Sequence, residues 1–182
     1  MSYIRMSDQK YPYTLAMYKK DNPGVVVPRT PKPEWYVNAG MAPVAKTARP
    51  EYDPLTQRLE LTVVLDGGAY RQNWQIVALS QAEADGRLAA HIATRTREIQ
   101  DALQQRLDEF AQTRGYDSIM SAATYATGSN AQFQPEGQYC VDIREQTWAQ
   151  AYAILDDFEA GNRGMPTVEE VLAEVAAPAW PQ

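Results

Sequence analysis

Hydrophobic and polar residues alternate along two neighbouring segments in the first half of the chain. Between Leu59 and Leu65 every second residue is aliphatic, which is the period of a strand with one buried face. A second apolar segment, Tyr70–Leu79, follows the sequence Asp66-Gly67-Gly68. Glycine adopts the positive φ values of a tight turn without steric cost. The pattern therefore predicts a β-hairpin over residues 59–79.

The second half of the chain changes to a helical period. Apolar residues recur at steps of three, four and seven, which predicts one helix over 80–114. Ser80 and Glu83 have the spacing of a capping box at its start, and Gly115 follows its end. At 1.5 Å per residue this helix is about 50 Å long. Its apolar stripe consists of Leu88, Ile92, Ile99, Leu103, Leu107 and Phe110.

This stripe has two interpretations, an intramolecular core or a seam between copies of the chain. Thr96 and Arg106 interrupt the heptad register, so a regular coiled coil is not indicated. Ile99 and Leu103 are assigned to the core of the protein.

Three further helices are predicted after the long one. The first covers 118–126, the second 135–160 and the third 168–176, which opens with a second capping box at Thr167. On the second of these helices, Trp148 and Tyr152 are assigned to the core.

Together these patterns predict an α+β fold, because strands are followed by helices without alternation. Residues 1–79 hold most of the prolines and tyrosines and are expected to form a small antiparallel β-rich interaction module. There, Tyr13–Tyr18 and Gly24–Val27 flank a turn sequence and are expected to be extended, as is the proline-rich segment Pro28–Pro33. Residues 80–182 are expected to form a helical module that the long helix connects to the first.

Composition narrows the function classes. The chain has 182 residues, 23 acidic against 17 basic, and a net charge of -6, which disfavours nucleic-acid binding. No apolar run is long enough to span a membrane, and the start of the sequence lacks the pattern of a signal peptide. One cysteine and one histidine exclude a disulfide within the chain and multi-histidine metal sites.

Few residues are of the types and in the spacing that catalysis or metal binding requires. Cys140 and His91 are the only pair typical of a nucleophile and its base, and a small cysteine hydrolase is the enzymatic alternative. The acidic pairs Asp156-Asp157 and Glu169-Glu170 lack the loop glycine and spacing of a calcium site. We therefore expect no enzyme, with no catalytic, cofactor-binding or metal-binding residues.

Aromatic residues are the more informative feature. Tyrosine and tryptophan are enriched at protein interfaces, because each combines a large apolar body with a polar group. The alternative is a small β core that uses aromatic rings for volume. The residues that we predict to bind a partner are Trp35, Tyr36, Tyr70, Trp74 and Trp180.

Two groups of short motifs resemble a known family. The first is an aromatic strand, Tyr70-Arg71-Gln72-Asn73-Trp74-Gln75-Ile76-Val77, followed by Leu79-Ser80-Gln81-Ala82-Glu83-Ala84 at the start of a long helix. The second group lies in the helical half and includes Gly115-Tyr116-Asp117-Ser118-Ile119 and Pro166-Thr167-Val168-Glu169-Glu170-Val171-Leu172. Over about residues 55–175 the chain resembles small proteins encoded beside the tail-fibre genes of tailed bacteriophages.

This resemblance implies a role without an enzymatic site. The chain would be a tail component that connects to or supports tail fibres or the baseplate through protein–protein contacts. The alternative is a tail-fibre assembly chaperone that the virion does not retain. Expected partners are tail-fibre or baseplate proteins, together with a possible homo-oligomer, and no nucleic acid or membrane. The expected location is the phage tail, or the host cytoplasm during assembly.

Overall fold

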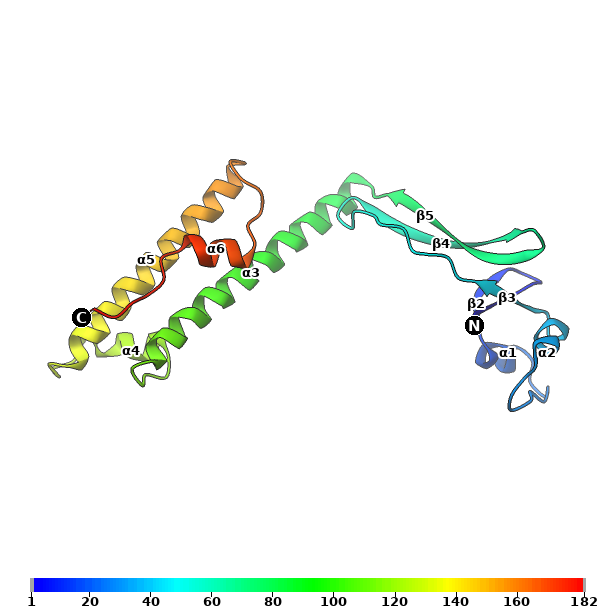
Figure 1. Ribbon diagram of the computed structural model, residues 1–182, viewed down its shortest axis with the longest axis horizontal. Helices are drawn as coiled ribbons and strands as arrows, with labels where there is room; N and C mark the ends of the chain where they lie inside the picture. The colour runs from blue at the N-terminus through cyan, green and yellow to red at the C-terminus, as the bar shows by residue number, and fades with distance from the viewer. Residues whose placement is uncertain (1, 182) are drawn as a thin grey trace. The chain divides into compact units, whose positions relative to one another are not determined.

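Five strands form one curled sheet in the first half of the chain, and helices make up the second half (Figure 1). This computed structural model describes residues 2–181 and confirms the predicted α+β class. The chain divides into two compact units, Met1–Asp85 and Gly86–Gln182, which we call the N-terminal and C-terminal units. The division falls inside the long helix.

The sheet has the strand order β2-β1-β3-β5-β4, and the predicted hairpin is its last pair. Gly67 and Gly68 form the two-residue turn with φ values of 57° and 82°. Both values lie in the left-handed region, as this type of hairpin turn requires. The strands are β1 (Ser2–Arg5), β2 (Lys10–Tyr13), β3 (Met41–Ala45), β4 (Gln57–Asp66) and β5 (Ala69–Ala78).

The expectation of a purely antiparallel sheet is wrong for one pair of strands. β3 and β5 run parallel, with Val44 opposite Tyr70 and Ala45 opposite Arg71. The reason is topological: β4 lies outermost, and β5 returns antiparallel to it between β4 and β3.

The N-terminal unit also contains two short helices, which the sequence analysis did not predict. α1 (Leu15–Asp21) replaces the extended segment expected up to Tyr18, because the Thr14 hydroxyl accepts a hydrogen bond from Met17 N at 3.2 Å and caps the helix. α2 (Pro33–Asn38) begins with proline, which is favourable at the first helical position.

The long helix α3 (Gln81–Gln112) begins with the predicted capping box. The Ser80 amide donates to Glu83 Oε2 at 3.0 Å, and the Glu83 amide donates to Ser80 Oγ at 3.4 Å. Ile99 and Leu103 are buried as predicted, whereas Leu88 is 46 % exposed. The apolar stripe is therefore core only in its C-terminal half.

The remaining helices match the predicted ranges closely. They are α4 (Ile119–Ala123), a 3₁₀ turn η1 (Thr124–Thr127), α5 (Phe133–Glu159) and α6 (Val168–Glu174). The second capping box is also confirmed, since the Thr167 and Glu170 side chains each accept a hydrogen bond from the other residue's amide, at 3.2 and 2.8 Å.

The core face of α5 differs from the predicted one. Tyr152 is 55 % exposed and Trp148 is half-buried, so the assignment of Tyr152 to the core is wrong. The inward face consists of four small residues and two isoleucines instead, and at Gly137 the backbone of η1 approaches closely. The buried residues of α5 are Gly137, Cys140, Ile143, Thr147, Ala151 and Ile154.

Arg106, which interrupts the heptad register of α3, anchors the end of α6. Its Nη1 donates to the carbonyl oxygens of Leu172 at 2.8 Å and Val175 at 3.2 Å, and Nη2 donates to that of Ala176 at 3.4 Å. These carbonyls lie where a helix end leaves acceptors unsatisfied and favours a positive charge.

Replacing Arg106 with methionine keeps most of the stem volume but removes these donors. We expect the variant to lose about 2 kcal/mol of the free energy of unfolding, since hydrogen bonds from a charged group are the stronger ones. Urea titration followed by circular dichroism measures this loss. The control is Arg97→Met at an exposed position on the same helix, where a change below about 0.5 kcal/mol is expected. Equal effects of the two substitutions would contradict the anchoring role.

Candidate functional site

One face of the β4–β5 hairpin is apolar and only partly covered. Residues directly opposite each other in an antiparallel pair share a face, and here Leu61 lies opposite Trp74 and Leu65 opposite Tyr70. Leu65 is 62 % exposed and Ile76 is 47 % exposed. We call this set the hairpin face; it comprises Leu59, Leu61, Val63, Leu65, Tyr70, Gln72, Trp74 and Ile76.

The topology explains why this face is open. β4 and β5 have ten residues each, but β3 pairs with only Tyr70 and Arg71 of β5. The rest of the hairpin is a two-stranded ribbon, which by itself is only marginally stable in water. Such a ribbon gains stability when another surface covers its apolar side.

Two side chains from elsewhere in the N-terminal unit reach this face. The Tyr11 hydroxyl accepts a hydrogen bond of 2.8 Å from Gln72 Nε2, and the Arg49 guanidinium lies 6.0 Å from the Trp74 ring centroid. The Trp74 indole nitrogen is buried and has no hydrogen-bond partner. Tyr11 and Arg49 thus contact the centre of the hairpin face, whereas Leu65 and Ile76 towards its two ends stay exposed.

The structure divides the five predicted partner-binding residues among three places. Tyr70 and Trp74 lie together on the hairpin face. Trp35 and Tyr36 lie on α2 in an aromatic cluster, where Tyr36 stacks on Tyr3 with ring centroids 4.1 Å apart. Both α2 residues are half-buried, and burial together with the neighbouring Tyr36 raises the pKa of Tyr3.

Trp180 packs against residues of its own, C-terminal unit. Its ring stacks on Phe110 at 4.2 Å between centroids, and its indole N–H donates to Thr113 Oγ1 at 2.9 Å. The Arg114 guanidinium covers the ring at 4.4 Å. These contacts hold the C-terminal tail at the end of α3, so the Trp180 ring packs within its own unit and does not belong to the hairpin face.

Sequence reasoning missed the aliphatic members of the hairpin face, above all Leu65 and Ile76. The sequence contained the information needed to find them. A two-residue turn fixes the register of the hairpin, and this register places Leu65 opposite Tyr70 and Ile76 opposite Leu59 on the same face. What the register does not reveal is that so little else covers the ribbon.

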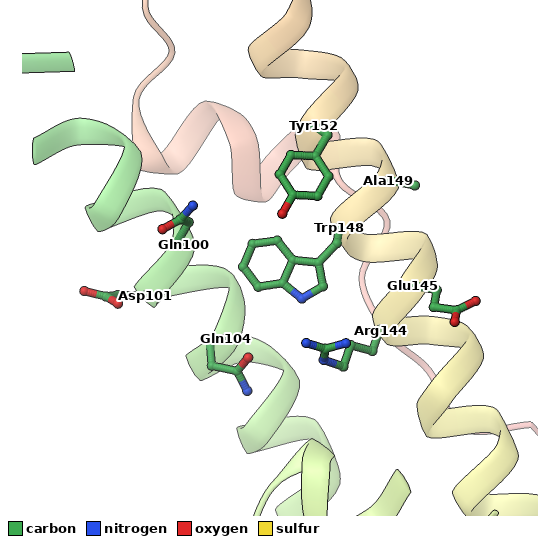
Figure 2. A pocket seen from close by; sticks show the side chains of 8 residues that line it. All are labelled: Gln100, Asp101, Gln104, Arg144, Glu145, Trp148, Ala149 and Tyr152. Atoms are coloured by element: carbon green, nitrogen blue, oxygen red, sulfur yellow. The ribbon is translucent and has the colours of Figure 1, made fainter. Parts of the chain in front are cut away.

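A second feature is an open groove of about 610 Å³ in the C-terminal unit, between α3 and α5 (Figure 2). Trp148 and Tyr152 lie one turn apart on α5, with ring centroids 6.1 Å apart. The Trp148 Nε1 and Arg144 Nε atoms are buried without a hydrogen-bond partner. The groove is lined by Gln100, Asp101, Gln104, Arg144, Glu145, Trp148, Ala149 and Tyr152.

The groove combines charged, amide and aromatic groups. Asp101 and Glu145 are acidic and Arg144 is basic, beside the rings of Trp148 and Tyr152. Gln104 already donates to Asp108 Oδ1 at 3.0 Å.

Cys140, the candidate nucleophile, is fully buried in the core of the C-terminal unit. Burial, with the nearby charge of Glu136, raises the pKa of Cys140 to about 11. A thiol of this kind is protonated at neutral pH, whereas a nucleophilic cysteine needs a lowered pKa. His91 is exposed on α3. The geometry therefore gives the hydrolase alternative no support.

Because the Cys140 thiol is buried and protonated, we expect the native protein to resist iodoacetamide at pH 8. In guanidinium chloride the same thiol should react within the normal time of a free cysteine, which mass spectrometry detects. The control is Ser129→Cys in a Cys140→Ser background, because residue 129 is exposed and its thiol should react in the native state. Rapid labelling of native Cys140 would contradict the assignment.

Residues 2–181 contain neither a candidate metal-binding cluster nor a candidate membrane-spanning helix. Among them, no cluster of three or more histidine, cysteine, aspartate or glutamate side chains is arranged to hold a metal ion. Nor does any helix in that range combine the length and apolar character needed to cross a bilayer.

The fold and the hairpin face define an α+β protein with an open apolar ribbon. Comparison with protein-family models, with curated protein sequences and with solved structures gave no match.

Proposed function

We propose that this protein is a non-enzymatic component of a bacteriophage tail that connects to or supports tail fibres or the baseplate. The observation that carries the proposal is the hairpin face, where Tyr70 and Trp74 lie beside the exposed aliphatic residues Leu65 and Ile76. An exposed apolar surface with aromatic residues is typical of a protein–protein interface. The phage assignment rests on the sequence motifs described above.

The aromatic cluster of α2 extends the binding role within the same unit. Trp35 and Tyr36 are half-buried, so each offers part of its ring to a partner while the rest packs on Tyr18 or Tyr3. Rings held in this way lose little conformational entropy when they bind.

The first experiment is to quantify the chain in purified phage particles by mass spectrometry. A fixed copy number relative to fibre or baseplate chains supports the proposal. Absence from particles, with the chain bound to fibre protein in the infected-cell lysate, supports the assembly chaperone instead. If phage particles neither contain the chain nor need it, both functions are wrong.

A substitution tests the hairpin face itself. Ile76→Asp places a charge on the exposed part of this face, so we expect at least a tenfold loss of incorporation or of fibre binding. Val26→Asp is the control, because Val26 is 87 % exposed and lies outside the hairpin. Both variants should keep the circular dichroism spectrum of the wild type. Equal binding by the two variants would remove the hairpin face from the interface.

A further inference from the structure

β4 is the edge strand of the sheet. One side of β4 pairs with β5 over all ten residues, and no strand of the sheet within residues 2–181 lies on its other side. The far side of β5 faces β3 and Thr47, and the Thr47 hydroxyl donates to the Gln72 carbonyl at 3.0 Å. Exposed edges of this length invite pairing with another strand. The two-residue turn closes on the pair of Asp66 and Ala69, and hydrogen bonding to β5 alternates from there. The outward amides and carbonyls therefore belong to Leu59, Leu61, Val63 and Leu65.

The side chains of this edge are complementary to themselves. When two copies of β4 are placed antiparallel around Thr62, Arg58 of each copy lies opposite Asp66 of the other, and Thr62 lies opposite itself. Opposite charges and threonine pairs at directly opposed positions stabilise antiparallel strands. The same register also pairs aliphatic residues on the hairpin face, namely Leu59 with Leu65 and Leu61 with Val63.

Neighbouring registers lack this complementarity. Any alternative register must keep the apolar side chains of both strands on one face. Its two-fold axis therefore passes through another residue of β4 and never between two residues. Centring the pair on Val63 puts Glu60 opposite Asp66, and centring it on Glu60 puts that carboxylate opposite itself. Centring it on Leu61 leaves Arg58 without an opposed carboxylate. Among these registers, only the one centred on Thr62 has two opposite-charge pairs. Centring the pair on Leu59 places Arg58 opposite Glu60, but only residues 57–61 of each β4 strand then pair, against 58–66 in the register centred on Thr62.

We infer that two copies of this chain associate through antiparallel pairing of their β4 edges, centred on Thr62. The pairing joins two five-stranded sheets into one and makes the two hairpin faces continuous. A contact confined to one strand pair is smaller than a standard interface of about 1,600 Å². The dimer is therefore weak and dissociates when the protein is diluted.

The charged groups that the pairing needs are accessible. Arg58 forms ion pairs with Glu60 at 3.1 Å and Glu83 at 3.3 Å, and its side chain is 42 % exposed. Asp66 pairs with Arg71 at 2.9 Å and is 60 % exposed. Surface ion pairs of this kind are weak, and each group has further hydrogen-bonding capacity. The second copy therefore extends two existing ion pairs instead of breaking buried ones.

Gln9, in the loop between β1 and β2, and Tyr11 of β2 approach the middle of β4. A groove of about 260 Å³ separates Gln9 and Tyr11 from Leu61, Thr62 and Val63. In the proposed register, Leu61 of the second copy lies opposite Val63 on the same face, and the groove is the space available to its side chain.

Charge reversal tests the register on the full-length chain. Wild type should sediment at twice its mass of 20.4 kDa at about 100 µM and dissociate on dilution. Arg58→Asp should weaken association at least tenfold, because two aspartates then oppose each other, and Asp66→Arg should do the same with two arginines. Mixing the two variants should restore a dimer, since every opposed pair is then complementary. Arg29→Asp, at an exposed position in a loop, is the control that should dimerise as the wild type does.

A wild-type chain that stays monomeric overturns the inference and leaves the edge to a strand of another protein. Variants that dimerise as well as the wild type overturn it too, and so does a mixture no more associated than its parts. Unchanged melting temperatures would show that the variants act on association and not on folding.

A cross-link tests the centre of symmetry directly. In a Cys140→Ser background, Thr62→Cys should form a disulfide between copies under mild oxidation, because the opposed β-carbons lie about 5 Å apart. Glu60→Cys lies on the same face, but its two copies are about 14 Å apart in this register and should stay unlinked. Cross-linking of Glu60→Cys in preference would overturn the register. The inference does not depend on the proposed phage role, because purified protein alone supplies the result.

Discussion

Replacing Leu103 with aspartate is expected to lower the free energy of unfolding of the C-terminal unit by more than about 4 kcal/mol. Leu103 has no exposed surface, and its neighbours in the core are Ile99, Ala151, Ile154, Val171 and Val175. None of these apolar side chains can pair with a carboxylate, so the variant has to bury an isolated charge or unfold the contact between α3, α5 and α6.

Leu88→Asp is the matched control, because Leu88 belongs to the same predicted stripe but is 46 % exposed. We expect it to change stability by less than about 1 kcal/mol. Urea unfolding followed by circular dichroism measures both variants. A large loss for Leu88→Asp would show that the first half of α3 is covered in solution, and a small loss for Leu103→Asp would contradict the core described here.

Gly137→Ala is the second substitution with a large expected effect. A β-carbon at this position would lie 2.4 Å from Ala126 N and 2.7 Å from the Tyr125 carbonyl carbon. Both are backbone atoms, so relief requires moving the helix α5 away from η1. We expect a loss of about 3 kcal/mol or more, at the upper end of what overpacking costs.

The chain provides a control of opposite sign for this substitution. Gly86 lies in α3, and a β-carbon there would have nothing within 4 Å. Gly86→Ala should therefore stabilise the protein by about 0.5–1 kcal/mol, because alanine is the better helix former. Thermal unfolding of the two variants distinguishes them by the direction of the shift. Equal shifts would mean that the close contact of α5 and η1 is absent.

Charge is distributed unevenly between the two units. The N-terminal unit has ten basic and nine acidic residues, whereas the C-terminal unit has seven basic residues, all arginine, and fourteen acidic ones. The C-terminal unit thus has a net charge of -7 and the N-terminal unit one of +1, which together give the -6 of the chain. The hairpin face belongs to the nearly neutral unit, where long-range repulsion opposes association least.

Local features were predictable from the sequence because their determinants lie within a few residues of each other. The hairpin turn at Gly67, and both capping boxes, need only backbone conformation and one side-chain hydrogen bond. The extent of the helical stripe followed from its period. α1 escaped prediction because a single cap at Thr14 outweighs the strand-like tyrosines around it.

Other features depend on contacts between distant residues. Arg106 looks like a break in a heptad until the carbonyls of α6, some 66 residues later, come within hydrogen-bond distance. Tyr152 looks like a core residue until the face of α5 that contains Ile143, Thr147, Ala151 and Ile154 proves to be the buried one. For the candidate site, Tyr70 and Trp74 were predicted, whereas the exposure of Leu65 and Ile76 was not.

By itself, the sequence determined the α+β class, the hairpin and the approximate extent of the helices after residue 80, because periodicity and turn chemistry are properties of short segments. Only the tertiary structure decided which apolar residues are covered. Burial depends on what packs against a surface: α5 and α6 cover one half of the stripe on α3, and β3 stops after two residues of β5. The open hairpin face and the free β4 edge are consequences of that packing.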